Sequence, residues 1–504
     1  MDSNSQIKRG VVLSYVSIGI TVLMGLFYTP WMISSIGKEN YGLYTLANSV
    51  IMFFMFDFGL SSAITRFIAK YLAEGRQDKA NNCLGIVYKL YFIVDILIFL
   101  ILLGIFFYIP EIYQKLTQEE LEKFKIVYAI ASIYSVLSFP FIPVNGILTA
   151  SEKFIQLKGC EVLQKVIIVV AMSICLLCGL GLYALVIVKA ASGAITILLK
   201  VYCIRKYTGN RVNFTYFERN EFREIISFSG WTTIVSFAQR FIFTIAPTLL
   251  GIFSGSVAIA IFGVANTLEG FVWTFSTAIS GMFLPMVSRI YVKGDGNILP
   301  LMIKVGRIQV YVIGLIVMGF ICMGNDFVDL WVGNGFHEAF IGTVLLILPS
   351  LIFTPQEIAN QAVLAQNKVK KQAAIFLLSS VFNVIVCCLL AGSLGALGIC
   401  IAVSITYFIR GSLMNIVYHK DLHINVFIFF KEAFAGPSVA LFVSLVVGFV
   451  INKFIPYQGW LYLSLKVTVF LLVYITSMVF VMNEYEKSLI IKPIKDLIQK
   501  TIKK

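Results

Sequence analysis

The sequence has few charged residues for its length. Charged side chains make up 13% of the 504 residues and hydrophobic side chains 59%, whereas a soluble domain has about 25% charged residues. A soluble fold with this composition would expose a large apolar surface to water. The composition therefore excludes an ordinary soluble protein. It predicts an all-α integral membrane protein, because a helix in lipid satisfies its own backbone hydrogen bonds.

Catalytic and metal-binding side chains are also scarce. Only three histidines are present, which gives little support to a histidine metal site or a histidine base. The nine cysteines include one Cys-x-x-Cys pair, Cys175 and Cys178, without a second pair at the spacing of a metal site. We therefore expect no catalytic residue, no cofactor and no metal, and we expect that the protein is not an enzyme.

Long apolar stretches dominate the chain instead. Residues 11–36 and 126–151 contain no charge, and each exceeds the roughly 20 residues that a helix needs to cross the hydrocarbon core. Division of the chain at charge clusters and at Gly or Pro turns predicts fourteen transmembrane helices. They span residues 11–36, 42–65, 84–109, 126–150, 160–178, 182–204, 225–253, 256–286, 304–323, 339–362, 372–391, 393–413, 433–452 and 460–482.

The distribution of Lys and Arg over the predicted loops indicates the orientation. With the N-terminus inside, the inside segments hold 29 of these residues, including Arg410 near a span end, and the outside loops hold 5. Cytoplasmic loops carry the excess of positive charge, so both termini are expected in the cytoplasm and the protein in the plasma membrane. A basic face beside anionic lipid explains most of the net charge of +14. No nucleic acid partner is expected.

The two halves of the chain carry the same landmarks in the same order, which indicates an internal duplication. The matched segments are Asn145–Lys153 with Asn360–Lys368, Leu176–Gly179 with Leu389–Gly392, Tyr41-Gly42 with Phe262-Gly263, and Pro30 with Pro247. A duplicated membrane bundle is typical of transporters. The predicted organisation is a six-helix bundle at 1–205, a cytoplasmic linker at 206–222, a second six-helix bundle at 223–430, an extra helix pair at 431–482 and a basic tail at 483–504.

Six of the charged residues inside predicted spans are the candidate site residues. A charge at the bilayer centre costs about 2.5–3.5 kcal/mol, so such residues normally face a cavity, a partner or a ligand. Substrate binding is expected of Arg240 and Lys189. Ion coupling or a counter-ion role is expected of Asp57, Glu269, Asp95 and Glu357.

Arg240 is the strongest of these candidates. It lies about fifteen residues into its predicted span, roughly 22 Å along a helix, and its planar guanidinium suits a phosphate. The alternative is a structural ion pair between Arg240 and Glu269. Lys89, Lys165 and Lys466 are instead expected to extend their ammonium groups to a nearby membrane interface.

The chain resembles a known family through two segments, Tyr41-Gly42-Leu43-Tyr44 and Asp57–Ala69, of which the second reads DFGLSSAITRFIA. These residues are similar to those of the Wzx-type oligosaccharide-lipid flippases of bacterial polysaccharide synthesis. Their superfamily also holds the multidrug (MATE) exporters and the lipid II flippases. The resemblance implies two bundles that open alternately to either side and an extra C-terminal helix pair.

The resemblance also implies a function, which is to move undecaprenyl-pyrophosphate-linked oligosaccharide repeat units across the plasma membrane. Its expected partners are the lipid-linked oligosaccharide, membrane lipids, and the polysaccharide polymerase and glycosyltransferases of the same synthesis. Two alternatives stay open: a cation-coupled multidrug exporter, which would favour acidic residues over a buried arginine, and a lipid II flippase. A scaffold or receptor role is less consistent with charges placed inside the membrane.

Overall fold

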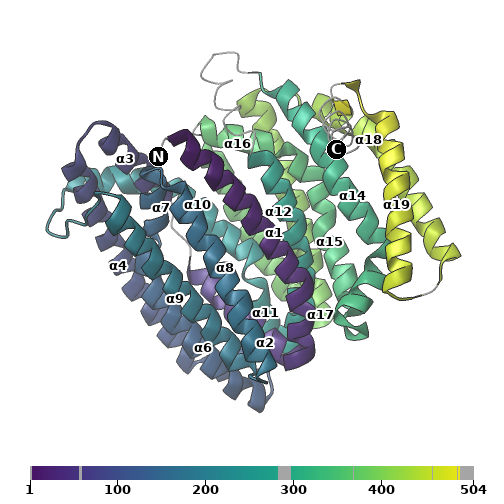
Figure 1. The fold of residues 1–504 in the computed structure, drawn as a ribbon, viewed down its shortest axis with the longest axis horizontal. Coiled ribbons are helices and arrows are strands. Elements are labelled where there is room, and N and C mark those ends of the chain that lie inside the picture. Colours follow the sequence, from purple (N-terminus) through teal and green to yellow (C-terminus); the bar gives the residue numbers. More distant parts are fainter. Residues whose placement is uncertain are drawn as a thin grey trace, which may run out of the picture. The chain divides into compact units, whose positions relative to one another are not determined.

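Every regular element in the described part of the chain is a helix (Figure 1). The computed structural model describes residues 3–55, 60–281, 297–366, 368–456, 458–484 and 486–487. The chain divides into two compact units, unit 1 with residues 1–264 and 373–406, and unit 2 with residues 265–372 and 407–504. The predicted bundle boundaries near residues 205 and 223 stay a prediction.

Unit 1 contains the first helices and part of α12 and α17. Its elements are α1 (Ser3–Ile36), α2 (Lys38–Phe54), α3 (Leu60–Ala73), α4 (Gln77–Phe107), α5 (Ile109–Ile112), α6 (Gln118–Ser138), η1 (Phe139–Phe141), α7 (Pro143–Ala150), α8 (Phe154–Leu177), α9 (Leu182–Tyr207), α10 (Arg219–Phe243) and α11 (Ala246–Phe253).

Unit 2 contains the remaining elements, and α12 (Ser256–Gly281) and α17 (Val369–Leu422) belong partly to each unit. The others are α14 (Leu299–Val332), η2 (Asn334–Phe336), α15 (His337–Phe353), η3 (Thr354–Gln356), α16 (Glu357–Ala365), α18 (Val426–Phe454) and α19 (Trp460–Val481).

The described residues contain 11 helices that are long and apolar enough to cross a membrane, or 12 if α10 and α11 form one bent span. The expected number was fourteen. One difference is the predicted span 42–65, which is described as parts of α2 and α3 with residues 56–59 outside the description. The other is α17, which continues through the two predicted spans 372–391 and 393–413.

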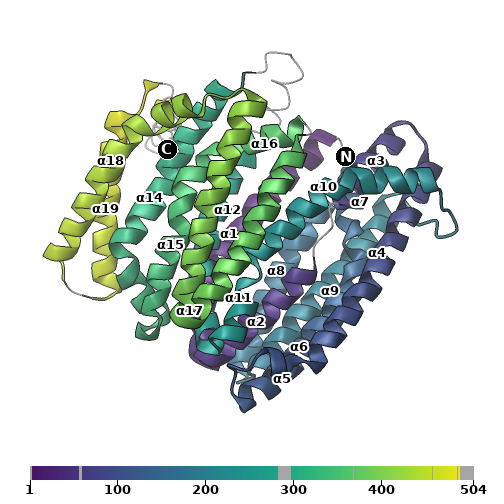
Figure 2. The ribbon, with the colours of Figure 1, turned by 180° about the vertical axis from the view of Figure 1, so that it is seen from behind.

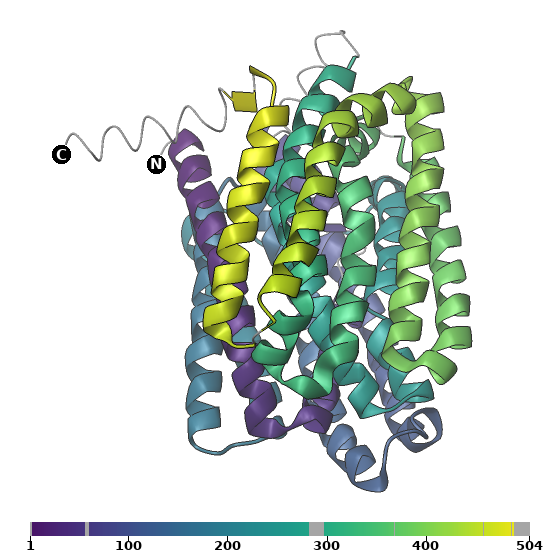
Figure 3. The same cartoon turned by 90° about the vertical axis from the view of Figure 1, so that its right-hand side faces the viewer.

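Helix α17 is broken inside its 54 residues. A straight helix of this length would measure about 80 Å, far more than the hydrocarbon core of about 30 Å. Gly395 has φ 55° and ψ −132°, which is not helical, and glycine adopts this conformation without steric cost. The Thr406 hydroxyl donates to Asn383 Oδ1 across 3.1 Å. The two arms on either side of Gly395 therefore pack against each other (Figure 3).

The described elements repeat at the offset that the sequence motifs predicted, the one that relates Asn145 to Asn360. At this offset the short helix η1 at residues 139–141 recurs as η3 at residues 354–356. Helices α7 and α16 end at Ala150 and Ala365, which are related by the same offset. An equivalent backbone hydrogen bond follows the end of each helix. The Lys153 N–H donates to the Leu148 carbonyl, and the Lys368 N–H donates to the Val363 carbonyl. The motif pair thus forms the same local structure twice.

The last two helices pack on α14 and form the core of unit 2 with it (Figure 2). Lys466 of α19 is 3% exposed, and its Nζ donates to Asp326 Oδ2 of α14 across 2.6 Å. The expectation that Lys466 reaches a membrane interface was therefore wrong. The physical reason is that α14 extends beyond its predicted end at residue 323 and brings a carboxylate to the ammonium.

Candidate functional site

The predicted seventh span is bent next to Arg240. Helix α10 ends at Phe243, α11 begins at Ala246, and the two helices meet at an angle of 41°. The Arg240 carbonyl accepts the backbone N–H groups of both Thr244 and Ile245, and these bonds close α10. Pro247, at the start of α11, has no N–H to continue the hydrogen-bond ladder. Arg240 therefore lies half-buried in the last turn before the bend.

A buried asparagine satisfies the carbonyl groups that the bend leaves without helical partners. Asn383 of α17 has no exposed surface. Its Nδ2 donates to the carbonyl oxygens of Phe241 (3.1 Å) and Ile242 (3.4 Å). Irregular backbone at membrane depth requires such partners, and broken helices of this kind commonly form the binding sites of transporters. Because all these residues belong to unit 1, Arg240, the bend and Asn383 form one local site.

Lys189 lies elsewhere in unit 1 and contacts neutral groups. It is half-buried on α9, and its Nζ donates to Asn48 Oδ1 of α2 across 2.6 Å. The same nitrogen lies 5.8 Å from the centroid of the Tyr44 ring, within the range of a cation–π contact. These partners hold the ammonium in place without cancelling its charge.

Of the two acidic candidates in the first half, the structure describes Asp95 and not Asp57. Asp57 falls on residues outside the described part of the chain. Asp95 lies on α4, on the same face as the buried side chains of Tyr91, Ile98 and Leu102. Its Oδ1 is buried, and within the described residues it has no hydrogen-bond partner.

Glu269 and Glu357 belong to unit 2 and interact with one arginine. The Tyr407 hydroxyl lies 3.4 Å from Glu269 Oε1 and donates to it. Glu357 Oε1 accepts from the amides of Asn360 (3.0 Å) and Gln361 (3.0 Å). Both carboxylates also interact electrostatically with Arg410.

Arg410 is the functional candidate that the sequence analysis missed. Its guanidinium carbon lies 4.5 Å from the centroid of the Tyr407 ring. It was counted with the cytoplasmic loops, because the apolar run ends at residue 413, but α17 continues as a helix to Leu422. Arg410 lies only fifteen residues after Gly395, about 22 Å along a helix, which is less than the hydrocarbon thickness of about 30 Å. This spacing was the signal that could have placed Arg410 inside the span. The alternative ion pair between Arg240 and Glu269 joins residues of different units and stays a prediction.

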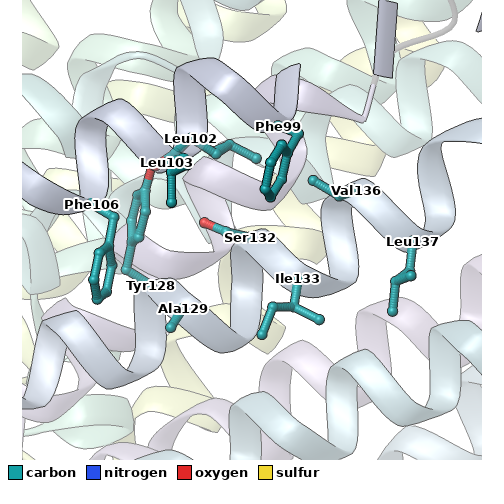
Figure 4. Close-up of a pocket in the computed structure, with 10 residues that line it drawn as sticks. All are labelled: Phe99, Leu102, Leu103, Phe106, Tyr128, Ala129, Ser132, Ile133, Val136 and Leu137. Atoms are coloured by element: carbon teal, nitrogen blue, oxygen red, sulfur yellow. The ribbon is translucent and has the colours of Figure 1, made fainter. Parts of the chain in front are cut away.

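A pocket lies between α4 and α6 of unit 1 (Figure 4). It has a volume of about 390 Å³, and its ten lining residues include no charged side chain. The Tyr128 hydroxyl at its edge donates to the Leu102 carbonyl across 3.0 Å. Its lining is apolar except for the hydroxyls of Tyr128 and Ser132, and it suits a hydrocarbon chain.

The fold places the chain in a class of membrane proteins. It is similar to the solved structure "Lipid II flippase MurJ, inward closed conformation", with 13% identity, a TM-score of 0.72, and coverage of 93% of this chain and 97% of that chain. It is also similar to "Inward-facing conformation of a multidrug resistance MATE family transporter of the MOP superfamily", with 13% identity, a TM-score of 0.60, and coverage of 84% and 98%. The chain therefore has the MOP superfamily transporter fold.

Residues 7–291 match the family described as polysaccharide biosynthesis protein, and the chain belongs to this family. Over 493 residues it is also 21% identical to the "Uncharacterized membrane protein EpsK" of Bacillus subtilis (strain 168), a match that covers 94% of this chain and 95% of that protein. The resemblance stated from the sequence is thus confirmed for family and fold. The chain is a multi-pass membrane protein of polysaccharide biosynthesis with a transporter fold, and it is not an enzyme.

Proposed function

We propose that the protein is a flippase that moves undecaprenyl-pyrophosphate-linked oligosaccharide repeat units across the plasma membrane by alternating access. The observation that carries the proposal is Arg240 beside the bend between α10 and α11. A fixed cation at a broken helix within a span suits a pyrophosphate, because the guanidinium fork donates parallel hydrogen bonds to phosphate oxygens. The family supports the pathway, since its description is polysaccharide biosynthesis.

The remaining charges receive roles in the same proposal. Lys189 is a second cation for the anionic part of the substrate, because its partner Asn48 leaves its charge in place. Asp57, Asp95, Glu269 and Glu357 are coupling or counter-ion residues. The carboxylates Glu269 and Glu357 favour a second candidate function, a cation-coupled multidrug exporter. The two functions differ in the charge of the substrate. A transport assay that compares an organic cation with a lipid-linked pyrophosphate therefore distinguishes them.

The proposal includes fourteen spans in two six-helix bundles with both termini in the cytoplasm. Single cysteines at Gln118 and Gly335, on a background without the native nine, should react with an impermeant thiol reagent from outside intact cells. A cysteine at Asp78 should react only after the cells are opened. All three positions are exposed, so labelling reports sidedness. Labelling of the Asp78 position in intact cells would contradict this topology.

Arg240 is the residue whose substitution tests the substrate class. Arg240→Ala should abolish complementation of polysaccharide export, whereas Arg240→Lys should retain a small fraction of it, because lysine keeps the charge and loses the fork. Export is normalised to the amount of protein in the membrane. Arg66→Lys is the matched control, because Arg66 is an exposed arginine of α3 in the same unit.

The rival explanation is a structural pair between Arg240 and Glu269. If that pair exists, each single substitution leaves an uncompensated charge and lowers protein abundance, and Arg240→Gln combined with Glu269→Gln restores both abundance and export. If Arg240 binds substrate, the double variant reaches the membrane and stays inactive. A fully active double variant would eliminate Arg240 as a substrate ligand.

A further inference from the structure

A second groove in unit 1 lies between α1 and α8, which run parallel. Gln6 Oε1 accepts the Ile155 N–H near the starts of both helices (3.2 Å). Further along, ten residues from Ile20 to Trp31 on α1 and from Val166 to Ser173 on α8 line a groove of about 450 Å³. Its lining is apolar except for the hydroxyls of Tyr28 and Ser173 and the indole of Trp31. Its rim is open, and Phe27 is 74% exposed.

A lysine with neutral partners lies at one end of this groove. Lys165 precedes the first α8 lining residue, and its Nζ donates to Ser17 O (2.9 Å), Ser17 Oγ (2.6 Å) and Thr21 Oγ1 (2.5 Å). Glu161, one turn earlier on α8, pairs with Lys158 across 2.9 Å. The ammonium of Lys165 is therefore oriented by hydroxyl groups, while the neighbouring acid is held by a different lysine.

This combination matches the two parts of an anionic lipid. A hydrocarbon chain fits the apolar groove, and a phosphate can replace one of the neutral oxygens that accept the three N–H groups of the Lys165 ammonium. Basic pockets between transmembrane helices bind lipid head groups in this way. The pocket between α4 and α6 has a similar size and a mostly apolar lining (Figure 4), and no charged residue is among the described residues that line either cavity. The groove differs because Lys165 directly precedes its first α8 lining residue.

We propose that the groove between α1 and α8 is a binding site for an anionic phospholipid, with one acyl chain along the groove and the phosphate on Lys165. The site is distinct from the bend at Arg240, and it is independent of which substrate the protein transports. It selects lipids by head-group charge, and the α4–α6 pocket does not.

Native mass spectrometry of the purified full-length protein tests the site. The protein is titrated separately with dioleoyl phosphatidylglycerol and dioleoyl phosphatidylcholine, and an apparent Kd is taken for the first bound lipid. Phosphatidylglycerol should bind more tightly, and Lys165→Gln should weaken its binding about fivefold, in line with the contribution of one lysine near anionic lipid. Lys165→Arg should restore the preference. Val170→Trp, which fills the groove, should weaken binding of both lipids.

Matched controls separate the site from general effects. Lys89→Gln removes another half-buried lysine of unit 1 that contacts Tyr216 and Phe217 instead of a groove. Ala129→Trp fills the α4–α6 pocket. Neither control should change the preference for phosphatidylglycerol. Equal binding of the two lipids, or an unchanged preference in Lys165→Gln, would overturn the proposal. Tighter binding of a polyprenyl phosphate that also depends on Lys165 would overturn the choice of phospholipid as the occupant.

Discussion

The two halves of the chain carry a polar contact on equivalent helices, with different chemistry. Asn48 corresponds to Glu269 at the same offset that relates Tyr41 to Phe262 in the repeat. In the first half Asn48 accepts a hydrogen bond from Lys189. In the second half Glu269 accepts one from Tyr407 and interacts with Arg410. Duplication thus preserved the place of the contact and not its charge.

The difference has a consequence for what each half can bind. The first half keeps one cation beside a neutral amide, so its positive charge stays available to an anion. In the second half, one arginine lies among two carboxylates, Glu269 and Glu357. At this contact the second half therefore neutralises the charge of Arg410 and retains acidic character, whereas Arg240, in the same half, lies beside the bend between α10 and α11 in unit 1.

The largest expected effect comes from removing the shared cation of the second half. Arg410→Ala leaves the half-buried carboxylates of Glu269 and Glu357 without this nearby cation. Removal of one partner from a fully buried ion pair costs about 3–5 kcal/mol, which is the upper bound here. We expect a severe loss of protein from the membrane, measured by immunoblot and by thermal unfolding. Arg410→Ala combined with Glu269→Gln and Glu357→Gln should recover abundance. Normal abundance of the single variant would contradict the role of Arg410.

A smaller effect is expected when the first half receives a carboxylate at Asn48, the position equivalent to Glu269 in the second half. Asn48→Asp places a carboxylate against the Lys189 ammonium and cancels its charge. Abundance should be unchanged and export should fall about tenfold, which corresponds to about 1.4 kcal/mol. Asn48→Gln keeps a neutral amide and is the control. Equal export by both variants would show that the charge of Lys189 is not used.

The smallest effect concerns an ion pair of the second half whose arginine is replaced by a phenylalanine in the first half. Arg307 corresponds to Phe92 at the offset that relates Asn360 to Asn145, and its Nη2 donates to Glu486 Oε2 (3.2 Å) after the end of α19. Burial would raise the pKa of Glu486, but hydrogen bonds from Arg307, the Asn483 backbone and Tyr311 outweigh it and lower the pKa.

The sign of the pH dependence follows from that lowered pKa. The stabilisation is present above the ordinary carboxyl pKa of about 4.3 and is lost as the pH falls through the lower folded-state value. The unfolding temperature should decrease by a few degrees in this acid range, and less in Glu486→Gln. Glu484→Gln, at a 91% exposed carboxylate, is the control. If the unfolding temperature of Glu486→Gln falls in acid as much as that of the unchanged protein, the acid sensitivity does not come from the ion pair of Arg307 and Glu486.

Much of the fold could be predicted because apolar length and the repeat are both readable in the sequence. The η1–α7 and η3–α16 segments recur at the offset that their motifs indicated. Helix ends were harder to predict, because a helix continues past its apolar run when its polar residues find partners. For this reason Arg410, near the end of its predicted span, was counted with the cytoplasmic charges and Lys466 was expected at an interface, although both make contacts inside unit 2. The contact partners of a charge depend on tertiary packing, which hydropathy does not report.

The amide of Asn383 makes the bend beside Arg240 the resting geometry of the chain. Its two N–H donations go to the carbonyls of Phe241 and Ile242, and its oxygen is engaged by Thr406. A straightened α10–α11 would return those carbonyls to helical donors and leave the buried amide without acceptors, a penalty of about 1–3 kcal/mol. One side chain therefore favours the bent form of α10–α11, and the orientation of the Arg240 turn is set before any ligand arrives.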